Sequence, residues 1–315
     1  MTRPFAAGLM LVGSLGAQPT EVATLATPAK ATSFVLAKTG RLAGAVCEDR
    51  KLLLWTLPDG RMLQTIDLSG RDIDAIAISE DGARIAAGDH GGGYTVWATS
   101  TGARQMHIQM PFYPFALVFS PDGKRLAIAP VGEPVQIYDP ASGQKRLALQ
   151  RTTGGTAAIA FSRDGGRIAT AGTDTVVRIY DARGGELLAR NADFLLVPLT
   201  ASFTADGKQL LAAGADKIIA WLDAANGNVI RASAKAADPV MSLHVSPDGS
   251  LVAALLMHAD NMLMAGPLVI SETASGRKVQ EWLPASLALG GGWTEDGRLL
   301  VATATAKAIH IWRVR

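Results

Sequence analysis

The chain has 315 residues, of which 48% are hydrophobic and only 18% are charged, and its formal net charge at pH 7 is +2. This length can bury a large core, and this composition argues against long disordered segments. Because the net charge is small and no block of lysine and arginine occurs, nothing in the charge favours nucleic acid or an anionic membrane as a partner.

The first seventeen residues resemble a secretory signal peptide. A positive charge at Arg3 precedes an apolar run over residues 5–12 and small residues up to Ala17. The pattern predicts cleavage after Gly16 or Ala17 and a mature domain over residues 18–315, periplasmic or secreted. The alternative is an apolar tail on a cytoplasmic protein. The run is too short to cross a membrane, and no transmembrane segment is expected.

An Asp-Gly turn recurs through the chain with a period of about 42 residues. The turn glycines are Gly82, Gly123, Gly165, Gly207, Gly249 and Gly297, with Gly40 as a weaker first copy. Residues 158–181 hold the clearest unit, in which the turn joins two apolar runs and a third run ends at Tyr180-Asp181. Four antiparallel strands per ~42 residues are typical of a propeller blade. The sequence therefore predicts an all-β, seven-bladed β-propeller of four-stranded antiparallel blades.

The two ends of the chain are expected to share one blade. The seventh unit stops at Arg315, immediately after its third apolar run, and so lacks a fourth strand. Residues 21–27 have the composition of a strand and follow the predicted cleavage site. Pairing the two segments would close the ring and remove an exposed sheet edge.

Two motifs link the chain to a known family. They are S-P-D-G at residues 120–123 and 246–249, and G-T-D-T-V-V-R-I-Y-D at residues 172–181. With them, the chain from about residue 20 is similar to the WD40-repeat family, and to its divergent bacterial members. The family's Trp-Asp ending survives only in part, and its Gly-His element is missing. The resemblance implies the propeller fold but no particular role, because the roles of the family vary widely. From the residues described below we expect a non-catalytic protein-interaction scaffold, a monomer without a cofactor, whose partner is another protein.

Aromatic and methionine residues gather in loops that the propeller places on one face. The predicted partner-binding residues are Phe112, Tyr113, Phe194, Trp282, Met262 and Met264. Exposed aromatic and methionine side chains with polar surroundings suit a protein-docking surface. The alternative is that several of them fold inward and fill the ring.

The sixth unit is six residues longer than the others and carries a candidate metal site. Met257, His258 and Met262 offer soft ligands for Cu(I), although methionine in such a loop also suits adaptable packing. Asp72 and Asp74 form a weak Ca²⁺ motif. Cys47 is the only cysteine, so no intramolecular disulfide is possible, and its apolar context predicts a buried, inert thiol.

The motifs of common enzymes are missing from the sequence. It contains no H-E-x-x-H, no P-loop and no C-x-x-C. The alternative function is a lactonase-like or quinoprotein-like propeller enzyme, or a metal-binding protein, using the channel mouth. Such sites need acidic and histidine groups around the channel, for which this chain offers only His244 and Asp74. His244 replaces a small residue and is expected near the axis, as a core histidine with its hydrogen bonds satisfied.

Overall fold

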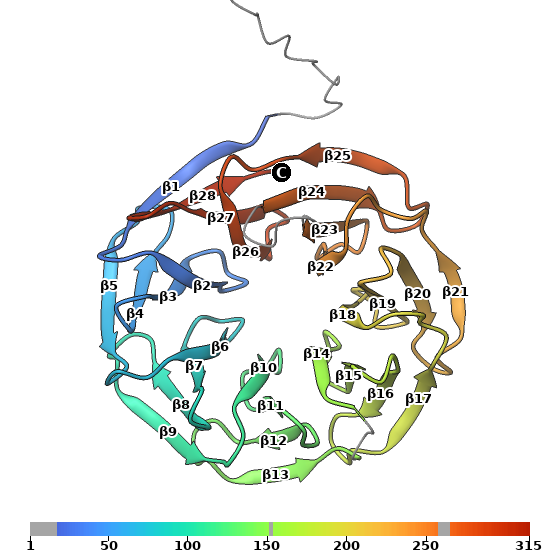
Figure 1. Ribbon diagram of the computed structural model, residues 1–315, viewed down its shortest axis with the longest axis horizontal. Coiled ribbons are helices and arrows are strands. Elements are labelled where there is room, and N and C mark those ends of the chain that lie inside the picture. The colour runs from blue at the N-terminus through green and yellow to red at the C-terminus, as the bar shows by residue number, and fades with distance from the viewer. Residues whose placement is uncertain (1–17, 151–153, 258–264) are drawn as a thin grey trace, which may run out of the picture.

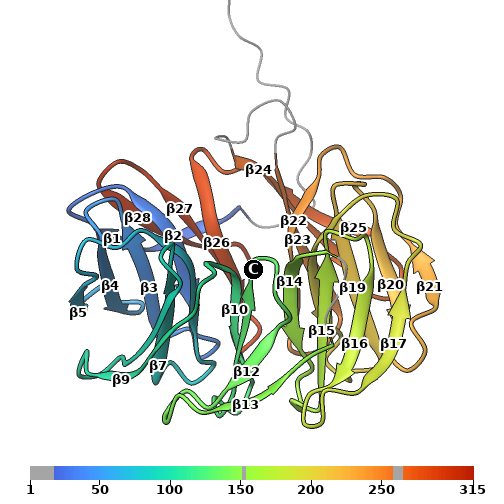
Figure 2. The same ribbon diagram turned by 60° about the horizontal axis from the view of Figure 1, so that its bottom comes forward.

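The computed structural model describes residues 18–150, 154–257 and 265–315, and these form twenty-eight strands in seven four-stranded sheets. Figure 1 shows the sheets as blades around a central axis, and Figure 2 shows the ring from the side. Six sheets pair four consecutive strands antiparallel in chain order from the axis outward, and the seventh adds the first strand of the chain as its outermost strand. The predicted seven-bladed β-propeller is confirmed.

The first four blades each take four consecutive strands, the first of which is the innermost. Blade 1 contains β2 (Ala31–Leu36), β3 (Leu42–Cys47), β4 (Lys51–Thr56) and β5 (Met62–Asp67). Blade 2 contains β6 (Ile73–Ile78), β7 (Arg84–Asp89), β8 (Gly93–Ala98) and β9 (Arg104–Gln109). Blade 3 contains β10 (Pro114–Phe119), β11 (Leu126–Pro130), β12 (Gln136–Tyr138) and β13 (Lys145–Ala148). Blade 4 contains β14 (Thr156–Phe161), β15 (Arg167–Gly172), β16 (Val177–Asp181) and β17 (Leu187–Asn191).

The remaining blades follow the same order. Blade 5 contains β18 (Pro198–Phe203), β19 (Gln209–Gly214), β20 (Ile219–Asp223) and β21 (Val229–Ala232). Blade 6 contains β22 (Val240–Val245), β23 (Leu251–Met257), β24 (Ala265–Glu272) and β25 (Lys278–Trp282). Blade 7 contains β26 (Leu287–Trp293), β27 (Leu299–Ala304), β28 (Ala308–Arg313) and, as its outermost strand, β1 (Thr20–Ala26).

Blade 7 joins the two ends of the chain. β1 lies antiparallel to β28, with Thr24 opposite His310, and the Thr27 amide donates a 3.0 Å hydrogen bond to the Lys307 carbonyl. Leu25 is fully buried there, in the same hydrophobic cluster as Ile309 and Ile311. The expected closing strand, residues 21–27, is confirmed as residues 20–26.

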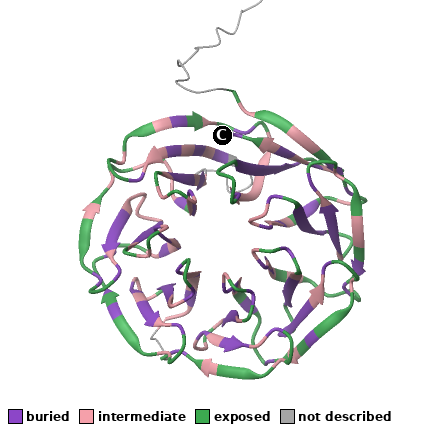
Figure 3. Cartoon of the chain, turned by 180° about the vertical axis from the view of Figure 1, so that it is seen from behind, coloured by how far each residue is buried: buried purple, intermediate pink, exposed green. Residues whose placement is uncertain are grey.

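The core lies between the blades, because each blade packs its two faces against its neighbours. All six residues of β3, and most residues of the other second strands, are buried. Small residues allow the sheets to approach closely: a Cβ at Gly44 would come within 2.7 Å of Ile85 in blade 2. The outer strands are largely exposed, as the green perimeter of Figure 3 shows.

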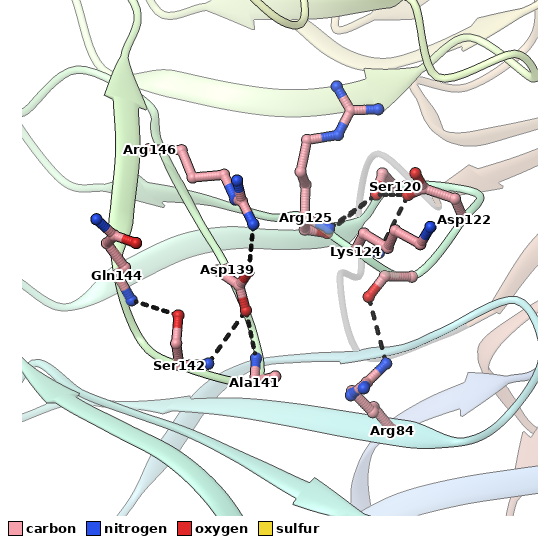
Figure 4. Close-up of polar contacts among 11 residues, drawn as sticks. Arg84, Ser120, Asp122, Lys124, Arg125, Asp139, Ala141, Ser142, Gln144 and Arg146 are labelled. Carbon is pink, nitrogen blue, oxygen red and sulfur yellow. Dashed lines mark hydrogen bonds and ion pairs between the residues drawn. The ribbon is translucent and has the colours of Figure 1, made fainter.

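The Asp-Gly turns join the first and second strands at the face that we call the lower face. In blade 4, the Ser162 hydroxyl donates to Asp164 Oδ1 at 2.6 Å and accepts from the Arg167 amide at 2.9 Å. Gly165 adopts φ +66°, which glycine tolerates best. Five other blades repeat this Ser/Thr–Asp bond, at Ser79, Ser120, Thr204, Ser246 and Thr294. Figure 4 shows the turn of blade 3.

Arginines of the second strands tie successive turns together. Arg84 donates to the Gly123 carbonyl at 3.5 Å, as Figure 4 shows. Arg125 donates to the Gly165 carbonyl at 2.7 Å in the same way. A third such bond joins Arg167 to the Gly207 carbonyl at 3.1 Å. We call these three bonds the arginine clasps; they connect blades 2, 3, 4 and 5 on the lower face.

Candidate functional site

A β-bulge occurs near the start of every innermost strand, on the opposite, upper face. In each case the register shifts across one residue, for example across Asp74 between Ile73 and Ala75. A bulge redirects the side chain of the extra residue. The seven bulged residues, which we call the bulge ring, are Thr32, Asp74, Phe115, Ala157, Leu199, Met241 and Leu289. The ring is apolar in blades 3 to 7 and polar in blades 1 and 2.

Blade-to-blade connections extend this apolar surface outward from the bulge ring. Leu195, in the connection from β17 to β18, is 86% exposed, and Leu283, between β25 and β26, is 61% exposed. Phe115 of the bulge ring is 51% exposed. Together with Phe112, Tyr113, Leu196 and Met241, these residues place seven exposed large apolar side chains on the upper face. Such a gathering marks interaction surfaces of soluble proteins.

The polar side of the upper face carries a cluster around His90. The His90 Nδ1 lies 3.1 Å from Asp74 Oδ2, and its ring stacks on Tyr113 with centroids 4.9 Å apart. The buried Tyr94 donates its hydroxyl proton to the Phe112 carbonyl at 2.9 Å, which holds this loop in place. The aromatic pair Phe112–Tyr113 is therefore presented on a fixed backbone, which lowers the entropy cost of binding.

The predicted partner-binding residues fall into four groups. Phe112 and Tyr113 are exposed on the upper face, as expected. Phe194 is only 8% exposed, so its predicted exposure is wrong: it packs in the cluster between blades 4 and 5, near Phe203. Trp282 is half-buried, with its ring 5.8 Å from that of Trp312. Met262 and Met264 lie outside the described residues.

The prediction from the sequence did not include several residues of the upper face. Leu195 and Leu196 directly follow Phe194, and the chain turns so that the leucines, rather than the phenylalanine, face solvent. Each residue of the bulge ring lies eight positions before the turn glycine of its own unit. That constant spacing was available in the sequence, and with knowledge of the bulge it would have identified Phe115, Leu199 and Met241.

The candidate metal ligands are only partly described. Met257 ends β23 and is partly buried, whereas His258 and Met262 lie outside the described residues, so the copper site stays a prediction. Within the described part of the chain, no three His, Cys, Asp or Glu side chains lie close enough to hold a metal ion. Cys47 is buried, and its burial raises the pKa of the thiol to about 11.

The axis of the ring is a channel with a volume of about 770 Å³. Residues of all seven innermost strands line it, among them His244. Burial lowers the pKa of His244 to about 4, so the imidazole is neutral at pH 7. No hydrogen bond joins its ring to another residue that the structure describes. The expected position near the axis is confirmed, but the expected hydrogen-bond partner is not found among those residues.

Comparison with known proteins identifies the repeat. Residues 147–181 match the family described as WD domain, G-beta repeat. A stretch of 106 residues is 32% identical to WD repeat-containing protein SL1-17 of Schistosoma mansoni, covering 33% of this chain and 35% of that protein. The chain is similar to WD40-repeat proteins.

A solved structure supports the propeller fold of this chain. The β-propeller domain of Cps50 (Swd1) from Myceliophteria thermophila superposes with a TM-score of 0.78, at 18% identity, covering 94% of this chain and all of that domain. At that identity the likeness concerns the fold alone. The match to the Schistosoma protein spans about a third of that protein's length. Among the described residues, no helix is long and apolar enough to cross a membrane.

Proposed function

We propose that this WD40 propeller is a non-catalytic scaffold that binds a partner protein through its upper face. The observation that carries the proposal is the concentration of seven exposed large apolar side chains around the upper mouth. A soluble protein rarely leaves such a surface uncovered, and aromatic residues are enriched in protein interfaces.

The surface has the composition of a docking site. Phe115, Leu195 and Leu283 supply apolar area that water solvates poorly, while the Asp74–His90 pair supplies a polar margin. Central apolar anchors surrounded by polar groups are the arrangement from which most binding energy arises. The Tyr94–Phe112 bond fixes one of the anchoring loops before a partner arrives.

The test is a quantitative pull-down from a lysate of the native host, followed by mass spectrometry. We expect the double variant Leu195→Ser, Leu283→Ser to lose the specific partner. The matched control is Leu188→Ser, Ile230→Ser, since these residues are similarly apolar and exposed but lie on the outer strands β17 and β21. Equal recovery of the partner by both double variants would contradict the proposal.

We further propose that the protein is exported and acts as a monomer. The support for export is the charge, apolar run and small residues of the first seventeen positions. Cell fractionation with sequencing of the mature N-terminus tests export, and finding the uncleaved chain in the cytoplasm would contradict it. Analytical ultracentrifugation tests the monomer.

A further inference from the structure

The channel has the dimensions of a small-molecule site. Its volume of about 770 Å³ lies within the range of about 300–1,000 Å³ typical of ligand pockets. Its wall combines apolar side chains, among them Val35, Ile76, Val118 and Phe161, with polar ones such as Ser202, Ser242 and His244. Met241 and Leu289 of the bulge ring line its upper end, so the channel opens at the docking surface.

One level of the channel wall carries a single large polar side chain. The residues five positions before each turn glycine occupy equivalent places in the seven innermost strands: Val35, Ala77, Val118, Ala160, Ser202, His244 and Gly292. Only blade 6 places a large polar group there. A neutral imidazole has one donor and one acceptor nitrogen, and among the described residues neither is hydrogen-bonded. His244 is half-buried and lines the channel, so a ligand in the channel can reach its free ring nitrogens.

The neighbouring strand leaves space beside this imidazole. A Cβ at Gly292 would have the His244 Nδ1, 3.9 Å away, as its only contact within 4 Å. Its backbone is also not in the left-handed region, so packing does not require a glycine. Gly291 differs, because a Cβ there would lie 2.4 Å from the Leu300 carbonyl oxygen. The absent side chain at Gly292 thus keeps the wall next to His244 open.

The lower mouth of the channel is narrowed by side chains and carries balanced charge. The residue before each turn aspartate, or before Thr39 in blade 1, lines it: Lys38, Glu80, Pro121, Arg163, Ala205, Pro247 and Glu295. Arg163 reaches from blade 4 to blade 6, where it donates to the Pro247 carbonyl at 2.7 Å, and Lys38 pairs with Glu80. Two cations and two carboxylates cancel, so the mouth does not favour a charged ligand.

We propose that the channel binds one uncharged, largely apolar organic molecule that carries a hydroxyl group, and that the His244 imidazole hydrogen-bonds this hydroxyl. The molecule enters from the upper mouth, buries its apolar part against the innermost strands and lies beside Gly292. This site is independent of the protein-docking function proposed above.

Isothermal titration calorimetry with naphthalen-2-ol and octan-1-ol, one aromatic and one aliphatic probe, tests the proposal. We expect 1:1 saturable binding of at least one probe to the wild-type protein. His244→Phe keeps an aromatic ring but removes both nitrogens. It should weaken the binding of that probe about tenfold, the effect of one lost hydrogen bond. Gly292→Val fills the space and should abolish binding. Leu195→Ser, on the docking surface, is the control and should bind as the wild type does.

Two further measurements keep the test decisive. Thermal melting establishes that each variant folds, and Ser202→Leu, at the equivalent position of blade 5, replaces Gly292→Val if that variant does not fold. Nitrogen chemical shifts of the His244 ring should move when the probe is added to the wild-type protein. Absence of saturable binding of both probes, equal affinity in His244→Phe, or loss of binding in Leu195→Ser would each overturn the proposal.

Discussion

The two faces of the propeller are built from the same strands but differ in kind. The lower face repeats one polar turn in six blades, with Ser or Thr bonded to Asp, and adds the arginine clasps between blades. The upper face repeats a bulge in every blade but fills it with different residues, from Asp74 to Phe115. Repetition on the lower face fits a stabilising role, and variation on the upper face fits the docking role proposed above.

The difference between the faces indicates where mutations should act. Hydrogen bonds of the lower turns are made within the protein and are lost when one partner is removed, so changes there should cost stability. The exposed apolar residues of the upper face contact mainly solvent, so changes there should cost binding and little stability. Both faces depend on the ring being closed.

The largest effect is expected at the closure of the ring. Leu25→Ala should lower the free energy of unfolding by about 2–5 kcal/mol, because it leaves a cavity beside Ile309 and Ile311. Urea unfolding followed by tryptophan fluorescence measures the change, with Ala26→Ser, at an exposed position of the same strand, as the control. A loss below about 1 kcal/mol would mean that β1 contributes little to closure.

The next largest effect is a pH dependence of the free energy of unfolding that arises from His244 in the channel. It falls in a different pH range from the effect of the lower turns. The pKa of His244 is about 4, below its ordinary value of 6.5, so the unfolded chain takes up a proton between these pH values and the folded protein does not. Stability should therefore fall as the pH drops from 6.5 to 4, by up to about 3 kcal/mol, and this group adds no further loss below 4. In His244→Phe, the free energy of unfolding should no longer fall between pH 6.5 and 4 on account of this group.

The lower turns should respond in a more acidic window. Hydrogen bonds from Ser246 and Ser250 lower the pKa of Asp248 from 3.8 to about 2, so its contribution is fully present above pH 3.8 and is lost as the pH falls through 2. His244→Phe should keep this loss. Unfolding measured between pH 7 and 2 distinguishes the windows, and an unchanged slope between 6.5 and 4 in His244→Phe would refute the assignment.

Removing one lower-face turn should cost about 2 kcal/mol. Asp164→Ala deprives the Ser162 hydroxyl and the Gly166 amide of their acceptor. The upper-face control is Asp72→Ala, which breaks only an exposed pair with Arg50 and should cost less than about 1 kcal/mol. Equal losses in the two variants, measured by chemical unfolding, would contradict the distinction between a stabilising lower face and a recognition face above it.

Removing one arginine clasp should lower the free energy of unfolding by about 1 kcal/mol. Arg125→Ala removes the bonds to the Gly165 and Ala182 carbonyls and the contact of the guanidinium with the Phe161 ring. Arg167→Ala, at the same position of blade 4, should also lose stability but by less, because it removes the single bond to the Gly207 carbonyl. Melting temperatures unchanged in both variants would show that the clasps do not stabilise the ring.

The smallest change in the free energy of unfolding is expected for substitutions on the upper face. Leu195→Ser and Leu283→Ser should each change the free energy of unfolding by less than about 0.5 kcal/mol, because both side chains are exposed. Differential scanning calorimetry measures this, and Phe194→Ser, which alters the buried neighbour of Leu195, should be strongly destabilising by contrast. Destabilisation by Leu195→Ser as large as by Phe194→Ser would assign the leucine to the core.

The repeat made the fold predictable, whereas the site was predictable only in part. Turn glycines, apolar runs and the incomplete seventh unit were enough to predict seven blades and a shared last blade, since each depends on local pattern and spacing. Phe112 and Tyr113 were also correctly placed. Phe194 was not, because three successive apolar residues do not reveal which of them faces the neighbouring blade.

The amino-acid sequence is sufficient to predict the number of blades, the turn between the first two strands of each blade and the strand that closes the ring. The tertiary structure was needed to show which side chains line the two mouths and which fill the spaces between blades. Turns and strands follow from residues close in the chain, whereas exposure depends on packing between blades. His244 and Gly292 are 48 residues apart in the chain, and only the packing of blade 6 beside blade 7 places them next to each other.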